Sequence, residues 1–381
     1  MTTIGILGGG QLGYMLALAG YPLGLHFKFL DPSPEAPVGR IAHRVTAQFD
    51  DRKALEKLAA GIELVTYEFE NVPVDSARFL EKLLPVLPAP VALEVAQDRL
   101  SEKQTFQKLG IATTEYAAPK VGEDPAVALK TVGYPAVIKT RRMGYDGKGQ
   151  WKVENPEEFA AVRGELPKVP LIVEHFVKFR RELSVLAVRS RTGEIAIYPL
   201  VENHHRAGIL RLSLAPAARV AESTRHAAEE AARQVLEALE YVGVLAIEFF
   251  ECDGKLLANE MAPRVHNSGH WTIEGAVTSQ FENHLRAVMG WPLGSTAATG
   301  HSAMINLIGE VPETASVLGV EAGHLHLYGK APRPGRKLGH FTVREESAEL
   351  LVERLQRLPP FFQKPEYCLS AATRMASERR T

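Results

Sequence analysis

The chain has 381 residues, a length that suits two or three packed domains rather than one small core. Its 44 lysines and arginines nearly balance its 45 aspartates and glutamates, so composition argues against a broad basic surface for nucleic acid or an anionic membrane. Two cysteines are too few for a disulfide framework, and no export signal or long apolar span is visible, so we expect a soluble cytoplasmic protein.

The first ninety residues alternate short apolar runs with helical stretches. We expect strands at 4–7, 25–30 and 64–69, and helices at 12–19, 52–60 and 76–84. Such alternation is typical of βα units and predicts a parallel sheet. The proline-rich stretch 85–90 then marks the first domain boundary.

A glycine-rich turn follows the first strand. Gly8, Gly10 and Gly13 have the spacing of a dinucleotide-binding fold, and Asp31 ends the second strand, where an acid would bind the ribose of NAD. The pattern itself only means a tight turn and backbone N–H groups at a helix N-terminus, which hold any phosphate. We therefore favour a phosphate site for another substrate, with NAD and a turn without a ligand as alternatives.

In the middle of the chain, a helix is expected at 99–108 and strands at 136–140 and 171–174. The first of these strands carries Lys139, and a glycine-rich flap at 144–149 follows. A lysine near a strand end often only lays its stem along apolar surface. Beside such a flap, however, it supplies a fixed cation where loop N–H groups approach phosphates, so we predict a phosphate site without the Walker spacing.

A hairpin is predicted downstream, where two apolar runs flank Asp253-Gly254. A two-residue loop would place Glu248 opposite Asn259, whereas a three-residue loop would place it opposite Glu260. Facing carboxylates destabilise a sheet, so these acids suggest a divalent cation rather than an ordinary edge-strand pair. Magnesium fits best, because it needs only one or two protein carboxylates together with substrate phosphates.

The segment after the hairpin, 261–272, is rich in hydrogen-bond donors and poor in helix formers, as active-site loops are. His266 and His270 have a spacing that zinc could use. No cysteine lies nearby, however, and Arg264 would oppose a cation. An anionic reactant suits the segment better.

The remaining signals are a long helix expected at 222–240 and several short strands after residue 301. One C-terminal segment, 328–337, holds four cations between prolines and glycines: Lys330, Arg333, Arg336 and Lys337. Such a cluster forms a compact anion site more readily than a solvated stripe, and a ribose 5-phosphate would suit it.

Taken together, these segments resemble the ATP-grasp superfamily, and the loop 259–272 looks specifically like the 5-(carboxyamino)imidazole ribonucleotide synthetase family within it. The resemblance covers essentially the whole chain. Further supporting segments are 8–13, 67–73, 97–103, 144–149, 198–203 and 334–340.

The resemblance implies a mixed α/β and α+β protein with an ATP-grasp fold. An N-terminal Rossmann-like domain (1–97) would bind substrate, and an ATP-grasp domain (98–295) would carry a flexible lid at about 110–172. A small β-rich domain (296–381) would follow. A homodimer is expected for this family.

The implied reaction couples ATP cleavage to carboxylation of 5-aminoimidazole ribonucleotide by bicarbonate, through carboxyphosphate. ATP and Mg²⁺ would be required, with Mn²⁺ as the alternative metal, and Glu248 and Glu260 would hold the metal. The catalytic residues would be Lys139, Asp146, Arg264 and His270. Asp146 would accept the amine proton.

The binding residues implied by the resemblance form two groups. ATP would be bound by Arg99, Lys139, Gly144, Tyr145, Asp146, Gly147, Lys148, Gly149, Gln150, Glu174, His175, Phe176, Val177, Glu182, His205, Asn259 and Glu260. The ribonucleotide and bicarbonate would be bound by Gln11, Leu12, Glu70, Tyr145, Asp146, Lys148, Ser268, His270, Lys330, Arg336 and Lys337.

Three positions depart from the family pattern: Tyr14 replaces an arginine, Val265 replaces a proline, and the hinge 174–177 lacks a glycine. The rival ligases are a formate-dependent glycinamide ribonucleotide transformylase and a biotin-carboxylase-like enzyme, and the loop 267–272 argues against both. The alternatives from other classes are an NAD-binding oxidoreductase and an inactive nucleotide-binding module. The presence of Lys139, Glu248 and Glu260 argues against the inactive module.

Overall fold

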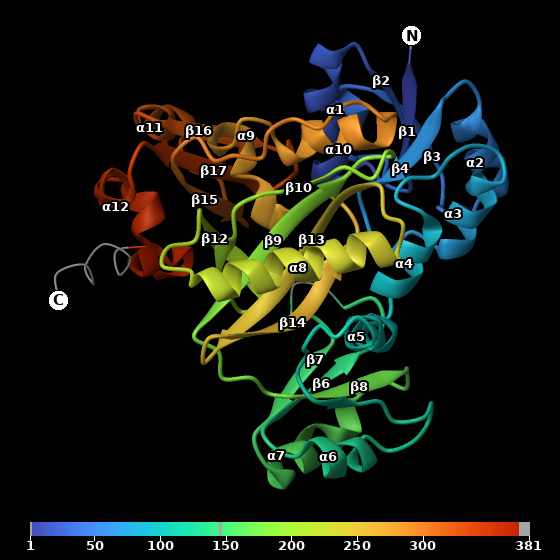
Figure 1. The fold of residues 1–381 in the computed structure, drawn as a ribbon, viewed down its shortest axis with the longest axis vertical. Coiled ribbons are helices and arrows are strands. Elements are labelled where there is room, and N and C mark those ends of the chain that lie inside the picture. Colours follow the sequence, from blue (N-terminus) through green and yellow to red (C-terminus); the bar gives the residue numbers. More distant parts are fainter. Residues whose placement is uncertain (1, 145–146, 373–381) are drawn as a thin grey trace.

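The structure, a computed structural model, describes residues 2–144 and 147–372. Within these ranges the chain forms three sheets, one parallel and two antiparallel, and the predicted mixed α/β and α+β architecture is confirmed (Figure 1). Tyr145 and Asp146 of the glycine-rich flap lie outside the described residues. In the described part of the chain, no helix is long and apolar enough to cross a membrane.

The N-terminal sheet is parallel throughout, with the order β3-β2-β1-β4. Its strands are β1 (Thr3–Leu7), β2 (His26–Asp31), β3 (His43–Thr46) and β4 (Leu64–Tyr67), and its helices are α1 (Gln11–Gly20), α2 (Arg52–Ala59), α3 (Val74–Glu81) and α4 (Pro90–Ala96). The sequence does not predict β3, because Val45 is its only buried side chain. Since β1 and β4 are parallel neighbours, the segments that follow them meet at one edge of the sheet.

The central sheet has nine strands among the described residues, in the order β14-β13-β9-β11-β12-β15-β17-β16, with β10 paired to β9. Its first six strands are β9 (Arg181–Arg189), β10 (Ile195–Ile197), β11 (Val201–Arg206), β12 (Ile209–Ala215), β13 (Gly243–Cys252) and β14 (Lys255–Ala262). Alternate side chains of β13 enter two cores: Val244 and Ala246 pack with α10 (Gln280–Met289), whereas Leu245 and Ile247 pack with α8 (Glu222–Ala238). Figure 1 shows α8 lying across β9 and β13.

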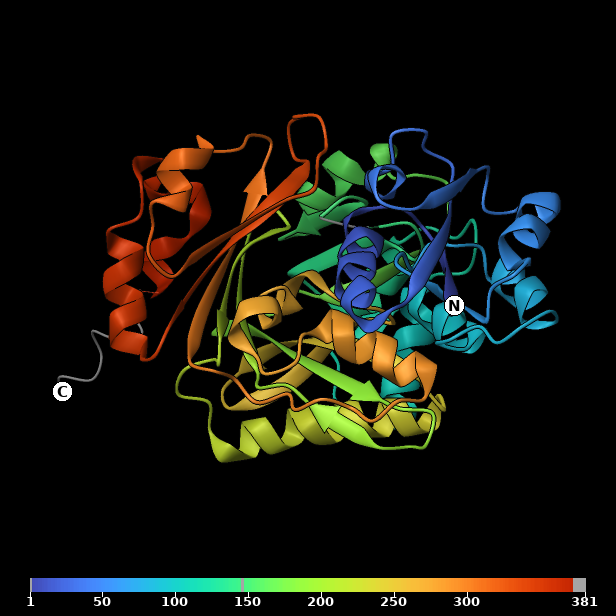
Figure 2. The ribbon, with the colours of Figure 1, turned by 90° about the horizontal axis from the view of Figure 1, so that it is seen from above.

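The C-terminal strands continue this central sheet. β15 (His301–Ile308) pairs with β12, β17 (Lys337–Glu345) pairs with β15, and β16 (Gly323–Leu327) pairs with β17. Helices α11 (Thr314–Leu318) and α12 (Ala348–Gln356) pack on this part, and Figure 2 shows it at the opposite end of the molecule from the N-terminal sheet. The short strands predicted after residue 301 are therefore present, and hydrogen bonds join them to the middle of the chain.

The third sheet, with the order β5-β8-β6-β7, lies below the central sheet in Figure 1. Its strands are β5 (Tyr116–Ala117), β6 (Ala136–Thr140), β7 (Gln150–Val153) and β8 (Leu171–His175). Helices α6 (Ala126–Val132) and α7 (Pro156–Val162) share an apolar core with it. Helix α5 (Arg99–Lys108) precedes this sheet and packs against α4 and β14. Its Lys103 Nζ lies 3.5 Å from Glu174 Oε2 on β8 and 2.9 Å from Asn259 O on β14, so the third sheet and the central hairpin meet at this helix.

Candidate active site

A cavity of about 850 Å³ lies where the three parts of the chain meet. The N-terminal part contributes Gln11, Leu12 and residues 68–71, and the C-terminal part contributes residues 333–337 and Lys330. The predicted site residues that line this cavity are Gln11, Leu12, Glu70, Arg99, Lys139, Gly144, Gly147, Lys148, Gln150, Glu182, His205, Glu248, Asn259, Glu260, Arg264, Lys330, Arg336 and Lys337.

The hairpin of β13 and β14 combines features of both predicted registers. Asp253 and Gly254 form a two-residue turn with φ values of 48° and 75°, as a type I′ turn requires. A β-bulge then shifts the register, so that Glu248 pairs with Glu260 and Asn259 is the extra residue. The loop is therefore short, yet the two carboxylates face each other.

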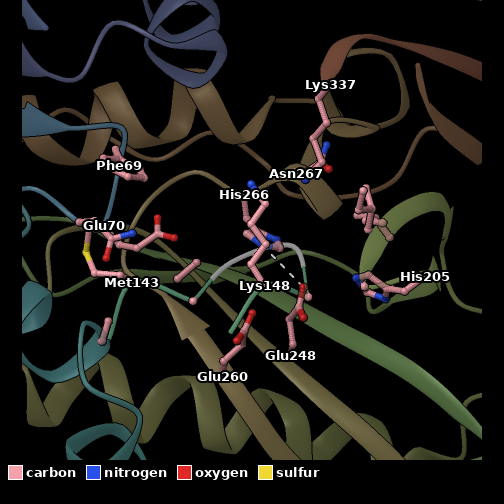
Figure 3. A pocket seen from close by; sticks show the side chains of 18 of the residues that line it. Phe69, Glu70, Met143, Lys148, His205, Glu248, Glu260, His266, Asn267 and Lys337 are labelled. Atoms are coloured by element: carbon pink, nitrogen blue, oxygen red, sulfur yellow. Dashed lines mark ion pairs between the residues drawn. The ribbon is translucent and has the colours of Figure 1, made fainter. Parts of the chain in front are cut away.

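The facing carboxylates have different environments (Figure 3). Burial, reinforced by the charge of Glu260, raises the pKa of Glu248 to about 7 although His205 opposes the shift. Burial acts on Glu260 too, but Arg99 Nη1 lies 2.9 Å from its Oε2 and holds the pKa of that carboxyl below its usual value. Within the described chain, Asn259 Oδ1 is buried without a hydrogen-bond partner. Two carboxylates and an unpaired amide oxygen are ligands that suit Mg²⁺, so these residues fit that ion.

Cations gather around Lys139 at the end of β6. Lys139 Nζ lies 2.9 Å from Glu174 Oε2, and Lys103 Nζ lies 3.5 Å from the same oxygen. Burial would raise the pKa of Glu174, but Lys139 and Lys103 together lower it to about 2. Burial lowers the pKa of Lys139, and Glu174 opposes that shift. Two ammonium groups thus share one carboxylate, and the remaining positive charge beside Arg99 suits nucleotide phosphates.

The glycine-rich flap connects β6 to β7, so the predicted pairing of Lys139 with this flap is present. At the base of the flap, Arg141 makes two hydrogen bonds of 2.8 and 2.7 Å to the carboxylate of Asp98, which caps helix α5. The described flap residues that line the cavity are Gly144, Gly147 and Lys148. The roles predicted for Tyr145 and Asp146 fall outside the described residues and stay predictions.

Glu182 on β9 and His205 on β11 line the cavity together, with 2.6 Å between Glu182 Oε2 and His205 Nδ1. Burial alone would lower the pKa of His205, but Glu182 and Glu248 raise it above its usual value. Residues of the predicted ATP site that do not line this cavity are Gly149, Glu174, His175, Phe176 and Val177. The side chain of Glu174 is only 3% exposed, so its carboxylate contacts the lysines and does not form part of the cavity wall.

Glu68, the residue after β4, closes the glycine-rich turn. Its Oε1 accepts a hydrogen bond from Gly10 N–H at 2.8 Å, and its Oε2 accepts from Leu12 and Gly13 N–H at 3.1 and 3.0 Å. A Cβ atom on Gly10 would lie 2.7 Å from Glu68 Oε1, so this approach requires glycine. The structure thus differs from the predicted phosphate site at the turn, because the protein's own carboxylate occupies the N–H groups that a phosphate would use.

The C-terminal cations Lys330, Arg333, Arg336 and Lys337 line the same cavity. Lys330 Nζ donates a hydrogen bond to Gln11 Oε1, which joins the C-terminal segment to the start of α1. Burial lowers the pKa of Lys330 to about 8, and the charges of Arg336 and Lys337 add to this effect while Glu68 opposes it. Lys330, Arg336 and Lys337 therefore form a compact positive wall beside Gln11.

The loop after β14 presents Arg264 and His266 to the cavity. Arg264 forms an ion pair with Glu70, and His266 Nε2 lies 3.6 Å from Glu248 Oε1 (Figure 3). The sequence reading considered His266 only as a zinc ligand. The sequence does contain a signal that His266 faces the cavity. Residues two apart in an extended segment point to the same side, and Arg264, two residues earlier, is a predicted site residue.

Ser268 and His270 do not line the cavity, although the resemblance places them at the ribonucleotide. They are 0% and 1% exposed. The ring of His270 packs against Phe281 and His340, and burial lowers its pKa well below the usual value. In this structure both side chains support the loop from behind, and neither is placed to contact a substrate.

Three family models match successive segments of the chain, which correspond to the three parts that meet at the cavity. The model of the ribonucleotide synthetase preATP-grasp domain matches residues 1–97, and that of the ATP-grasp domain matches 104–281. The model of the phosphoribosylaminoimidazole carboxylase C-terminal domain matches residues 302–354. Fold and site therefore define an ATP-dependent ligase of the ATP-grasp class.

An N5-carboxyaminoimidazole ribonucleotide synthase from Pseudomonas aeruginosa is 52% identical over 352 residues, covering 92% of this chain and 97% of that protein. The corresponding synthetase structure from Thermus thermophilus is 60% identical with a TM-score of 0.89, covering 94% of this chain and 98% of that one. The Aspergillus clavatus structure in complex with ADP and 5-aminoimidazole ribonucleotide is 31% identical with a TM-score of 0.87, covering 94% and 97%. The chain belongs to the N5-carboxyaminoimidazole ribonucleotide synthase family, and the predicted resemblance is confirmed.

Proposed function

We propose that this chain carboxylates 5-aminoimidazole ribonucleotide with bicarbonate while it cleaves ATP to ADP and phosphate, as a step of purine biosynthesis. The observation that supports this most strongly is that one cavity holds two separate cation clusters. Lys139 and Arg99 lie beside the facing carboxylates, whereas Lys330 and Arg336 come from the C-terminal segment. Two anionic groups, the nucleotide triphosphate and the ribonucleotide phosphate, would fill these clusters.

For the metal, we assign Glu248, Glu260 and Asn259 as the protein ligands of Mg²⁺. Among the described residues, no cluster of three or more His, Cys, Asp or Glu side chains could cage a metal. The phosphates of ATP would therefore complete the coordination, which is the usual arrangement for Mg²⁺. When bound, the ion would neutralise negative charge on the phosphoryl group during transfer.

The chemistry would occur in two steps. A bicarbonate oxygen attacks the γ-phosphorus of ATP and ADP leaves, a reaction that needs in-line positioning and cations rather than a protein nucleophile. Lys139 and Arg99 would stabilise the charge, and Arg264, held by Glu70, would lie near bicarbonate. The amine nitrogen of the ribonucleotide then bonds to the carboxyl carbon of carboxyphosphate, or of the carbon dioxide it releases, and phosphate departs. Asp146 would accept the amine proton.

Other parts of this proposal come from the family alone. They are the bicarbonate substrate, a homodimer and a flexible lid at about 110–172, whereas the proposed cytoplasmic location comes from the composition of the sequence. We place Ser268 and His270 behind the loop rather than on the ribonucleotide, because both are buried. Carboxyphosphate is unstable in water, so closure of the glycine-rich flap over the cavity would protect it.

The deciding assay measures ADP release with bicarbonate, with and without 5-aminoimidazole ribonucleotide. We expect ADP release to depend on bicarbonate, to rise strongly when the ribonucleotide is added, and to accompany transfer of labelled carbon from bicarbonate into the ribonucleotide. Formate with glycinamide ribonucleotide is the matched control for the rival ligase. ADP release that responds to this pair and ignores aminoimidazole ribonucleotide would refute the assignment.

A further inference from the structure

A buried row of side chains links His266 to three strands of the central sheet. Ser213 Oγ donates to Asn203 Oδ1 at 2.8 Å, and Asn203 Nδ2 donates to Ser184 Oγ at 2.9 Å. Ser184 Oγ then donates to Ser268 Oγ at 2.9 Å, and Ser268 Oγ lies 2.9 Å from His266 Nδ1. We call Ser213, Asn203, Ser184 and Ser268 the serine–asparagine chain; each member is at most 3% exposed.

A backbone contact shows the direction in which these hydrogen bonds run. Ser268 N–H lies 3.3 Å from His266 Nδ1, and because an N–H group can only donate, Nδ1 is an acceptor. A neutral imidazole that accepts at Nδ1 carries its proton on Nε2. The hydroxyl of Ser268 can then also donate to Nδ1, which leaves its oxygen free to accept from Ser184. Every hydrogen bond of the chain therefore donates toward His266, and none opposes this direction.

His266 is the end of the chain that reaches the cavity. Its Nε2 points toward Glu248, and a dashed line marks this contact in Figure 3. The distance between His266 Nε2 and Glu248 Oε1 is 3.6 Å. Because Nδ1 accepts a hydrogen bond from Ser268 N–H, it carries no proton, and the ring is neutral. A neutral ring exists in two tautomers, and only one of them presents an N–H donor to the cavity.

We propose that the serine–asparagine chain is a positioning device that holds His266 in its Nε2–H tautomer, so that the ring presents a donor to an oxygen atom of the reactants. Ser268 then acts through His266 and does not touch the ribonucleotide. The identity of the reactant oxygen rests on the proposed function, whereas the tautomer does not. Ser268, Ser184, Asn203 and Ser213 are accordingly positioning residues for the reaction.

The backbone of the loop has anchors outside this chain. The side chain of Gln280 accepts from His266 N–H at 2.8 Å and donates to His266 O at 2.7 Å. The amides of Asn267 and Asn306 form two hydrogen bonds with each other, of 3.0 and 2.8 Å. Removal of one hydroxyl group from the chain should therefore change the tautomer of the ring more than the position of the loop.

The test reads the two ring nitrogens of His266 by ¹⁵N NMR in the full chain labelled with ¹⁵N-histidine. His266→Gln identifies its signals among the 13 histidines. In the wild type we expect a protonated Nε2 and an unprotonated Nδ1. Ser268→Ala removes the closer donor to Nδ1, at 2.9 Å, and leaves only the longer backbone contact of 3.3 Å. Ser184→Ala frees Ser268 Oγ to accept from an Nδ1–H. The preference for the Nε2–H tautomer should therefore weaken, and each variant should show a mixture of tautomers. Ser302→Ala, a fully buried serine on β15 outside the chain, is the matched control and should leave the pattern unchanged.

Activity supplies a second readout. Ser268→Ala should lower kcat about tenfold while KM for ATP stays within about twofold, because a positioning group is lost and no nucleotide contact is. The signals of the other histidines report whether each variant is folded. If Ser268→Ala does not fold, the result for Ser184→Ala decides the test. A wild-type proton on Nδ1, or an unchanged nitrogen pattern in a folded variant, overturns the proposal whatever the activity. If the tautomers shift as expected but the wild type lacks ligase activity, the proposed function fails and the positioning device stands.

Discussion

Glu248 lies directly opposite Glu260 across β13 and β14, even though only two residues join these strands. The bulge at Asn259 makes this pairing possible, and it adds an unpaired amide oxygen to the two carboxylates. Like charges that face each other destabilise a sheet unless a cation lies between them. We therefore expect the hairpin to be a metal-binding element whose cost to the fold is offset when the cation and ATP bind.

The first prediction concerns charge at the reacting phosphates. Lys139→Ala and Glu260→Gln should each lower kcat at least about a hundredfold, because each removes charge stabilisation of phosphoryl transfer. The measurement is ADP release at saturating ATP and magnesium, with circular dichroism to check the fold. Lys152→Ala on the neighbouring strand β7 and Glu237→Gln on the exposed side of α8 are the controls. Near-normal turnover in either site variant would contradict the assigned roles.

The second prediction concerns the glycine-rich turn. Glu68→Ala leaves three backbone N–H groups without their acceptor, so the free energy of unfolding should fall by about 2 kcal/mol. Urea denaturation measures this, with the exposed Glu63→Ala as control. NADH titration of the wild type should show no binding, because Glu68 and Asp31 occupy the N–H groups that its phosphates would need. Saturable binding of NADH would instead favour the oxidoreductase alternative.

The third prediction is a loss of stability in acid that arises at His284. Its Nδ1 accepts from Val244 N–H at 3.1 Å, so Nε2 carries the proton and donates to Thr66 Oγ1 at 2.9 Å. This ring thereby ties α10 to β13 and to the N-terminal sheet. Burial lowers the pKa of His284 to about 4.

The direction of this pH effect follows from the difference in proton binding between the folded and unfolded states. An unfolded histidine takes up a proton near pH 6.5, whereas folded His284 does so only near pH 4. The unfolded state therefore binds more protons between these values, and stability should fall by up to about 3 kcal/mol as pH decreases from about 6.5 to 4. Urea unfolding between pH 7 and 5 should show a weaker pH dependence for His284→Gln than for the wild type. His226→Gln, on the exposed side of α8, should keep the wild-type slope; equal slopes in all three proteins would exclude His284 as the cause.

The fourth prediction concerns the ribonucleotide. Lys330→Ala combined with Arg336→Ala should raise KM for 5-aminoimidazole ribonucleotide by at least about tenfold, since each lost charged hydrogen bond costs about 1.5 to 3 kcal/mol. KM for ATP should change little. In the wild type, KM for the ribonucleotide should also rise above about pH 8, where Lys330 loses its proton.

A matched control for this pair is the double replacement Arg357→Ala with Lys364→Ala, which removes the same charge away from the cavity. Steady-state kinetics with each substrate varied in turn make the comparison. An unchanged KM for the ribonucleotide, or an equal loss for ATP, would show that Lys330 and Arg336 serve the fold or the nucleotide.

Local patterns were enough for much of the fold. The predicted helix 99–108 and strand 136–140 have the observed bounds. The strand is a short apolar run, and the helix begins directly after Asp98, whose side chain caps it. Lys139, the glycine-rich flap and the Asp253-Gly254 turn are likewise local features, and the family resemblance that they support is confirmed.

Other features depend on contacts between distant residues. Glu68 closes a turn that lies 58 residues before it, and no local pattern reports that approach. The bulge at Asn259 has no marker such as a glycine, so the register of Glu248 stayed open. The burial of Ser268 follows from Ser184 and Asn203 on two other strands, which only the assembled sheet brings together.

The pairing of β15 with β12 has a mechanical consequence. Through β15, this pairing joins β17, which begins at Lys337, to the same hydrogen-bonded central sheet that carries Glu248 and Glu260. Separating β17 from the β13–β14 hairpin would break the backbone hydrogen bonds between the strands that connect them. Among the described residues, the small sheet β5-β8-β6-β7, which carries Lys139, shares no strand with the central sheet. We expect the catalytic cycle to move the small sheet as a unit toward the central sheet. The central sheet would stay rigid and would keep the proposed metal ligands and the proposed ribonucleotide phosphate site at a constant separation.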